Sequence, residues 1–163
     1  MIRRPSSSLF RGYSFIDIDE VIEKAAKKSI ARIFEDDGES VFRELESQVL
    51  KEIGLRHSLV VATGGGLVTK SNNWGILHQG VVIWIDPGRK RLLQRLQSDQ
   101  TIRPLLKKSN FIESFDVLLK DRNPIYLQSD VHVHVDDEAP QEVAFLILNN
   151  LTYLFKNQEA LNE

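Results

Sequence analysis

The amino-acid sequence predicts an α/β protein built on a parallel sheet. Short apolar runs alternate along the chain with segments of helical periodicity, an order typical of parallel strands joined by helices. Two of these runs, residues 59–62 and 81–85, contain no charged residue, as is common in strands covered on both faces. The length of 163 residues and a hydrophobic fraction of 42% fit one globular domain.

The first part of the chain is predicted to form one strand and three helices. Residues 13–19 combine aromatic and β-branched side chains and end in carboxylates, which indicates a strand. Residues 20–28 have helical composition, and Ser29 is expected to cap a short helix after them. Residues 40–53 form a strong amphipathic pattern. The apolar residues of its predicted inward face are Val41, Leu45, Val49 and Ile53.

The stretch 59–66 joins an apolar run directly to three consecutive glycines, Gly64, Gly65 and Gly66. We expect a strand buried on both faces, followed by backbone that can approach a ligand closely. Ligands of open α/β sheets bind outside the carboxyl ends of strands. The pattern therefore predicts a site at the three glycines, with a plain flexible turn as the alternative.

The next part of the chain continues the alternation of helices and strands. Residues 71–79 are predicted to form a short capped helix, residues 81–86 a buried strand, and the basic segment to about residue 97 another helix. Residues 98–110 are mostly polar, which favours a mobile loop and suggests a lid near 98–112.

The last part of the chain is predicted to contain a helix, a strand and a final helix. The helix from residue 111 is expected to end near Asn123, because this residue precedes a proline. Valines alternate with His132 and His134 in residues 131–135, which predicts a strand with one exposed face. Residues 140–154 are predicted to be helical. The sequence thus contains four predicted strands.

Composition excludes several functional classes. A net charge of −2 gives no case for binding nucleic acid. No apolar run approaches the roughly 20 residues that a membrane helix needs. The chain has no cysteine, so disulfides, thiolate catalysis and cysteine metal sites are excluded. The His132-x-His134 pair suggests a metal ligand set, but no third ligand has a suitable spacing, and a structural role is favoured.

Two carboxylates follow the first predicted strand. Asp17 and Asp19 are two residues apart, so on a strand both side chains would point to one face. There they could hold Mg²⁺ through water or orient a hydroxyl group. The alternative is an ordinary strand-to-helix turn with Asp19 as the N-cap.

Three arginines are also candidates for an anion site. Arg43 and Glu46 lie on one helix face, either as a solvated surface pair, which is the commoner case, or as a site for a carboxylate ligand. Arg103 lies in the polar stretch, where it could reach a phosphate. Arg122 at a helix end could hold an anion as well. Each of the last two is otherwise a surface arginine.

Taken in order, the motifs strongly resemble those of the shikimate kinase family, from about residue 12 to residue 154. The resemblance implies the nucleoside-monophosphate-kinase type of P-loop fold, a three-layer α/β/α parallel sheet. It also implies a monomer that phosphorylates the 3-hydroxyl of shikimate with ATP and Mg²⁺, in the chorismate pathway to aromatic amino acids. The location implied is the bacterial cytoplasm or the plastid stroma. The motifs are Asp17-x-Asp19, Ile33-Phe34-x-x-x-Gly38-Glu39-x-x-Phe42-Arg43-x-x-Glu46, Thr63-Gly64-Gly65-Gly66, Arg103-Pro104-Leu105-Leu106 and Arg122-x-Pro124-x-Tyr126.

The resemblance also implies a role for each of these residues. Asp19 would orient the attacking hydroxyl, and Arg103 on the lid would reach the transferring phosphoryl group, which makes them the catalytic pair. Asp17 would contact Mg²⁺ through water, and Arg95 would lie near the adenine. The residues expected to bind or enclose shikimate are Asp19, Arg43, Gly64, Gly65, Gly66, Arg122, Phe34, Phe42 and Glu46.

One part of the family pattern is absent from the 163 residues. The family opens with a strand and a G-x-x-x-x-G-K-[ST] loop, but no Gly-Lys-Ser or Gly-Lys-Thr occurs here. In a sheet of order 2-3-1-4-5, the central first strand would be missing. We therefore expect residues 1–11 to be a disordered tail or truncation remnant, followed by a single domain over 12–156. The options are a truncated or wrongly started product, which is favoured, a strand donated by another chain, or two half-sheets that close on each other.

Three functions remain open from the sequence. The first is a shikimate kinase with impaired catalysis, because the P-loop would supply the phosphate contacts. The second is a non-catalytic relative that binds shikimate or a protein partner. The third is an α/β interaction module whose site residues no longer bind a substrate.

Overall fold

The computed structural model describes residues 12–98 and 110–161. The chain divides into two compact units, and each is described by itself. Of the described residues, the first unit contains 12–80 and 110–126, and the second contains 81–98 and 127–161. The single domain expected over residues 12–156 stays a prediction.

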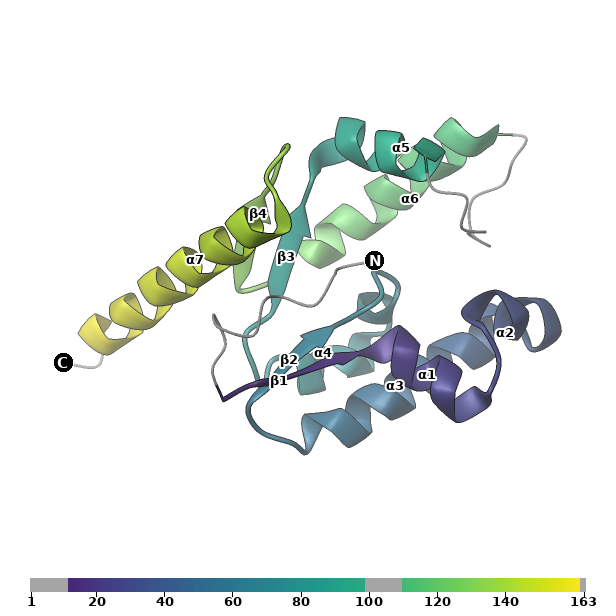
Figure 1. The fold of residues 1–163 in the computed structure, drawn as a ribbon, viewed down its shortest axis with the longest axis horizontal. Helices are drawn as coiled ribbons and strands as arrows, with labels where there is room; N and C mark the ends of the chain where they lie inside the picture. The colour runs from purple at the N-terminus through teal and green to yellow at the C-terminus, as the bar shows by residue number, and fades with distance from the viewer. Residues whose placement is uncertain (1–11, 99–109, 162–163) are drawn as a thin grey trace. The chain divides into compact units, whose positions relative to one another are not determined.

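The first unit contains two parallel strands and the helices that follow them (Figure 1). Its elements are β1 (Ser14–Asp17), α1 (Ile18–Ala26), α2 (Ile30–Asp36), α3 (Gly38–Gly54), β2 (Leu59–Ala62), the 3₁₀ helix η1 (Leu67–Thr69), α4 (Ser71–Leu77) and α6 (Phe111–Tyr126). The register of β1 and β2 runs from Ser14 opposite Leu59 to Asp17 opposite Ala62. Ser29 caps α2 by accepting a hydrogen bond from the Arg32 N–H at 3.3 Å, which confirms the predicted cap.

Helix α3 supplies much of the core of the first unit, through a face that includes the predicted Leu45, Val49 and Ile53 but not Val41. Phe42, Leu50 and Ile53 are buried, whereas Val41 is 44% exposed, and the prediction for Val41 was wrong. The buried stripe includes a carboxylate, Glu46, so hydrophobicity alone favours the neighbouring stripe. The other buried apolar residues of this core are Ile18, Ile22, Ile33 and Leu67.

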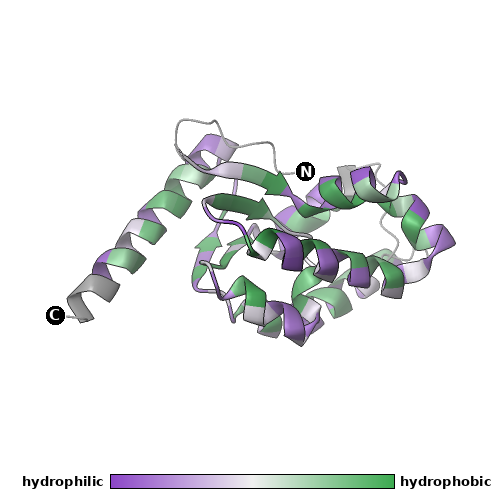
Figure 2. Cartoon of the chain, turned by 90° about the horizontal axis from the view of Figure 1, so that it is seen from below, coloured by the Kyte–Doolittle hydropathy of each residue, from purple (hydrophilic) through white to green (hydrophobic). Residues whose placement is uncertain are grey.

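The second unit contains β3 (Ile83–Asp86), α5 (Gly88–Ser98), β4 (Val131–His134) and α7 (Pro140–Leu161). Strands β3 and β4 are parallel, with Ile83 opposite Val131. The valines of β4 are buried and its two histidines are exposed, as the alternating pattern predicts. Helix α7 packs on these valines through its apolar residues. In Figure 2 this helix, which runs toward the end marked C, carries hydrophobic and hydrophilic residues along its length.

The described residues thus form two two-stranded parallel sheets, of order β1-β2 and β3-β4. These neighbours match strands 2-3 and 4-5 of the order that the resemblance implies. Every residue of β2 and β3 is only partly buried, so the expectation of complete burial on both faces was wrong. Each of these strands has one ladder partner among the described residues, which leaves part of its surface accessible.

Helix α6 differs from its predicted end. It continues through Pro124 to Tyr126, although Asn123 was expected to end it. A proline in the final turn removes one backbone hydrogen bond. The Tyr126 hydroxyl, at the end of the helix, donates a hydrogen bond to the Gly65 carbonyl at 2.9 Å. The expected lid near 98–112 and its Arg103 fall largely outside the described residues. Within the described part of the chain, no helix is both long and apolar enough to cross a bilayer.

Candidate active site

The three glycines follow β2, and the carbonyl groups of all three are held by hydrogen bonds. The Gly64 carbonyl accepts from the Leu67 N–H at 3.1 Å, and the Gly65 carbonyl accepts from Tyr126. The Gly66 carbonyl accepts from the N–H and hydroxyl of Thr69, at 3.1 and 2.7 Å. Among the described residues, no group accepts a hydrogen bond from the Gly65 or Gly66 N–H. These two donors are available to a ligand.

The segment after the glycines is fixed by two buried side chains of α4. Asn73 donates its amide to the Leu67 carbonyl at 2.8 Å, and the Trp74 indole N–H donates to the Val68 carbonyl at 2.9 Å. Both side chains are less than 10% exposed. The glycine segment is therefore anchored on its carboxyl side by the core and is not a plain flexible turn.

Charged side chains lie against the backbone at Gly64 and Gly66. A Cβ atom at Gly64 would lie 2.9 Å from Glu46 Oε1 and 3.6 Å from Asp19 Oδ1. A Cβ atom at Gly66 would overlap the Arg43 guanidinium. A side chain at either position would therefore displace Glu46 or Arg43, whereas glycine leaves both in place.

Gly65 is approached from helix α6. A Cβ atom at this position would lie 2.6 Å from the Tyr126 hydroxyl and 3.5 Å from Arg122 Nη1. Arg122 and Tyr126 are four residues apart and so lie on one face of α6. The same short segment therefore meets two arginines, one from α3 and one from α6.

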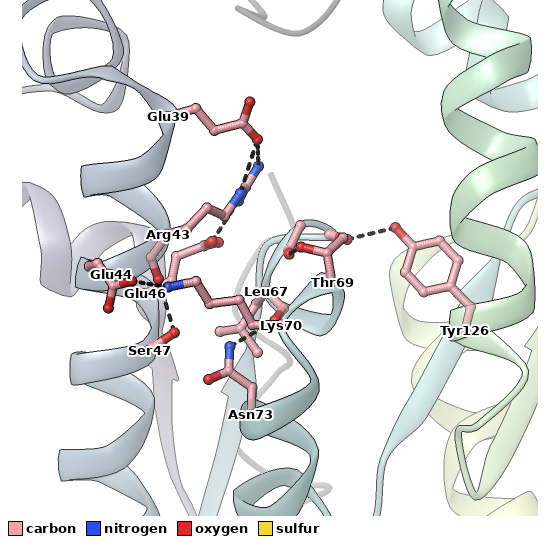
Figure 3. Close-up of polar contacts among 12 residues, drawn as sticks. Glu39, Arg43, Glu44, Glu46, Ser47, Leu67, Thr69, Lys70, Asn73 and Tyr126 are labelled. Carbon is pink, nitrogen blue, oxygen red and sulfur yellow. Dashed lines mark hydrogen bonds and ion pairs between the residues drawn. The ribbon is translucent and has the colours of Figure 1, made fainter.

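Arg43 and Glu46 form a buried ion pair on α3 (Figure 3). Arg43 Nη1 lies 2.5 Å from Glu46 Oε2, and Nη2 lies 3.0 Å from the Glu39 carboxylate. The side chain of Glu46 is 1% exposed and that of Arg43 is 12% exposed, so the surface-pair alternative is wrong. Burial raises the pKa of Glu46, although Arg43 opposes the shift.

Two aromatic rings line the guanidinium of Arg43. Its Cζ lies 5.2 Å from the ring centre of Phe42 and 6.0 Å from that of Phe34, within reach of a cation–π attraction. The two rings pack at 4.8 Å between centres. Burial is the largest single effect on the pKa of Arg43 and lowers it, but the hydrogen bonds and charges of Glu46 and Glu39 together outweigh burial, and the net pKa is raised. Arg43 is thus a fixed, permanent cation.

The sequence predicted that Asp17 and Asp19 share one face of a strand, and the structure shows that they do not. Strand β1 ends at Asp17, and Asp19 lies in the first turn of α1. Asp17, and not Asp19, is the N-cap: its Oδ1 accepts from the Asp19 and Glu20 N–H groups at 2.9 and 3.4 Å. The first N–H groups of a helix have no partner within the helix, and the Asp17 carboxylate accepts hydrogen bonds from two of them. The strand therefore ends at Asp17 and the helix begins after it.

Two carboxylate oxygens in this site are buried without a partner. Asp19 Oδ1 and Glu46 Oε1 accept no hydrogen bond from the described residues, and both lie within 3.6 Å of the Cβ position at Gly64. Burial raises the pKa of Asp19, and the charges of Asp17 and Glu23 raise it further, while Arg43 opposes the shift. Buried polar atoms of this kind need hydrogen-bond donors.

The arrangement has two chemically different ends. At Gly64, the partnerless oxygens of Asp19 and Glu46 can accept hydrogen bonds from hydroxyl groups. At Gly65 and Gly66, the guanidinium groups of Arg43 and Arg122 and free N–H groups can bind a carboxylate. A small molecule that carries hydroxyls at one end and a carboxylate at the other would satisfy both ends.

Two predicted site residues are not among the described residues of the first unit. Arg95 is exposed on α5 in the second unit, and Arg103 lies outside the described residues. Tyr126 has no role predicted from the sequence, although it stands in the Arg-x-Pro-x-Tyr motif. Asn73 gives no sequence signal, because its hydrogen bond to Leu67 depends on the packing of α4.

His132 and His134 belong to the second unit, where they lie on the exposed face of β4. His132 Nε2 lies 3.1 Å from Asp86 Oδ2, and His134 Nδ1 lies 3.8 Å from the same oxygen. The His132 ring also stacks on Trp84 at 3.9 Å. Across the described residues, no group of three or more histidine, aspartate or glutamate side chains is placed to hold a metal ion.

Comparisons with known proteins agree with the motifs. The family model for shikimate kinase matches residues 7–152. A shikimate kinase of Prochlorococcus marinus (strain MIT 9211) is 58% identical over 150 residues, which are 92% of this chain and 76% of that protein. A shikimate kinase of Synechococcus sp. (strain CC9605) is 53% identical over 146 residues, covering 90% of this chain and 73% of that protein.

Solved structures give the same result for the fold. The shikimate kinase of Acinetobacter baumannii in complex with shikimate superposes with a TM-score of 0.81 at 35% identity, over 87% of this chain and 80% of that one. The shikimate kinase of Aquifex aeolicus gives 0.75 at 35% identity, over 90% and 86%. The fold is therefore the α/β P-loop kinase type, and the chain belongs to the shikimate kinase family.

Proposed function

We propose that the protein binds shikimate at the three glycines and transfers the γ-phosphoryl group of ATP to the 3-hydroxyl. The observation that carries the proposal is the meeting of two partnerless carboxylate oxygens and two guanidinium groups at residues 64–66. Shikimate has three hydroxyls and one carboxylate, and thus fits both ends of the site. The solved relative bound to shikimate supports this choice of ligand.

Each charged side chain of the site then has a defined role in holding shikimate. Asp19 accepts a hydrogen bond from the attacking hydroxyl and orients it, and Glu46 holds Arg43 while it accepts from a neighbouring hydroxyl. Arg43 and Arg122 bind the carboxylate. Phosphoryl transfer depends mainly on positioning and charge stabilisation, and these residues supply the positioning of the acceptor.

The described residues do not assemble a corresponding site for ATP and Mg²⁺. Oδ1 of Asp17, the expected Mg²⁺ contact, caps α1, and the 163 residues contain no Gly-Lys-Ser or Gly-Lys-Thr. We therefore derive no step through the nucleotide or the metal ion. Our proposal includes impaired catalysis by these 163 residues, since the P-loop lysine and hydroxyl are not among them. The alternative is a non-catalytic protein that binds shikimate or a protein partner.

The test combines a binding and a rate measurement. We expect isothermal titration calorimetry to detect shikimate binding, and Asp19→Asn to weaken it. A coupled ADP-release assay with shikimate, ATP and Mg²⁺ should show a slow rate that Asp19→Asn abolishes. A rate no higher than that of Asp19→Asn would favour the non-catalytic alternative. No heat and no thermal shift with shikimate would contradict both. Size-exclusion chromatography with light scattering tests the monomer that we also propose.

A further inference from the structure

Tyr126 is a polar group at the glycine segment to which the proposed function assigns no task. Its hydroxyl donates to the Gly65 carbonyl at 2.9 Å and lies 2.6 Å from where a Gly65 Cβ would be. The two residues are 61 positions apart in sequence, so this bond joins the end of α6 to the segment after β2. In Figure 3, Tyr126 approaches the segment from α6, and Arg43 approaches it from α3.

The Tyr126 bond fixes the direction of the next amide. The Gly65 carbonyl and the Gly66 N–H belong to one planar trans peptide unit, in which the two groups point in opposite directions. A hydroxyl that holds the Gly65 carbonyl toward α6 therefore holds the Gly66 N–H away from α6. Glycine has no side chain that would restrict this peptide, so without the hydroxyl the peptide can rotate. No described residue accepts from the Gly66 N–H.

The peptide held by Tyr126 lies between the two arginines. A Cβ at Gly65 would lie 3.5 Å from Arg122 Nη1, and one at Gly66 would overlap the Arg43 guanidinium. The Gly66 N–H is thus a third donor at the carboxylate end of the site. Thr69 holds the other side of Gly66 through its carbonyl, so Tyr126 supplies the restraint on the peptide that precedes it.

We propose that Tyr126 is a positioning residue for carboxylate recognition, which acts by orienting the Gly65–Gly66 peptide and by holding α6, with Arg122, against it. This inference rests on the proposed function, because the ligand carboxylate is that of shikimate. Tyr126 itself does not touch the ligand in this account. Its effect reaches the ligand through the Gly66 N–H and Arg122.

The test is Tyr126→Phe, which removes only the hydroxyl. One hydrogen bond corresponds to a change of roughly three- to tenfold in an equilibrium constant, so we expect the Kd for shikimate to rise by about that factor in calorimetry. The analogue whose carboxylate is reduced to a hydroxymethyl group should bind wild type and Tyr126→Phe equally. Tyr153→Phe is the control, since Tyr153 is 71% exposed on α7 in the second unit.

The outcomes separate this inference from the proposed function. If wild type shows no binding of shikimate, both are overturned. If wild type binds and Tyr126→Phe binds equally well, only the role of Tyr126 is overturned. An equal loss for shikimate and the reduced analogue would show a general structural effect and would also overturn it. A thermal melt of each variant without ligand keeps a change in folding distinct from a change in carboxylate recognition.

Discussion

Replacing Asp19 by asparagine should stabilise the fold while it removes shikimate turnover. Asp19 Oδ1 is buried without a partner, and the charges of Asp17 and Glu23 repel its carboxylate. Asparagine removes the charge and places an amide donor in the region where Glu46 Oε1 also lacks a partner. Both carboxylate oxygens lie within 3.6 Å of the Cβ position at Gly64, and we expect the new amide to donate a hydrogen bond to Glu46.

Two effects of the substitution oppose each other, and their sizes decide the sign. A negative charge in the first turn of α1 stabilises the helix by about 0.3–1 kcal/mol, which asparagine loses. A buried polar atom without a partner costs about 1–3 kcal/mol, and two such atoms become paired. We therefore expect a net gain of about 1 kcal/mol in the free energy of unfolding, or roughly 2–4 °C in Tm for a chain of this size.

The gain should depend on pH. Because the folded state raises the pKa of Asp19, the folded protein holds this proton more tightly than the unfolded chain does. Wild-type stability therefore falls as the pH rises from the ordinary aspartate pKa, about 3.9, through the raised value. Asp19→Asn does not titrate, so its advantage should grow over this window and vanish below it. Glu46 shifts in the same direction and affects both proteins.

Urea denaturation at several pH values measures the effect, and a double-mutant cycle with Glu46→Gln tests its cause. The gain from Asp19→Asn should shrink when Glu46 is also replaced, because the acceptor of the new hydrogen bond has changed. Glu23→Gln, an exposed change on the same helix, should alter stability by less. A loss of stability in Asp19→Asn at pH 7, or full additivity with Glu46→Gln, would refute the reasoning.

Two further predictions use matched neighbours as controls. Gly66→Ala should weaken shikimate binding at least tenfold in calorimetry, because its Cβ displaces the Arg43 guanidinium while the backbone φ of −88° suits alanine. Gly75→Ala, in open space on α4, should leave binding unchanged and stabilise the fold by about 0.5–1 kcal/mol; equal binding by both variants would contradict the assignment. Phe42→Ala should cost about 3–5 kcal/mol in urea denaturation, whereas Val41→Ala should stay within about 0.5 kcal/mol. A larger loss of stability in Val41→Ala than in Phe42→Ala would instead support the burial of Val41 predicted from the sequence.

The sequence predicted most elements of the fold because most are local. The alternating valines of β4 and the Ser29 cap each follow from neighbouring residues and are found in the structure. The error in the end of α6 has a long-range cause. Helix α6 continues past Pro124 to Tyr126, whose hydroxyl bonds to Gly65, 61 positions away in the chain. The sequence of the helix alone does not predict that bond.

The site was predicted through its motifs and not through local pattern. On its own, the spacing of Arg43 and Glu46 favoured a solvated pair, because most such pairs on helices are exposed. The structure buries both side chains, since the glycines leave room for them against the backbone and Phe42 turns the same face inward. Burial is a property of how α3 packs against α1, α2, α4 and η1, so no inspection of α3 alone could have found it.

Burial also explains why these charges are informative about function. A buried ion pair contributes little net stability, since desolvation offsets much of the attraction, and a partnerless carboxylate oxygen is destabilising. Two such oxygens, from Asp19 and Glu46, face the same glycine. A fold selected for stability alone would replace one of them by an amide. Their presence beside Gly64, which follows the carboxyl end of β2 where α/β sheets bind ligands, favours a ligand that brings the missing hydroxyl donors.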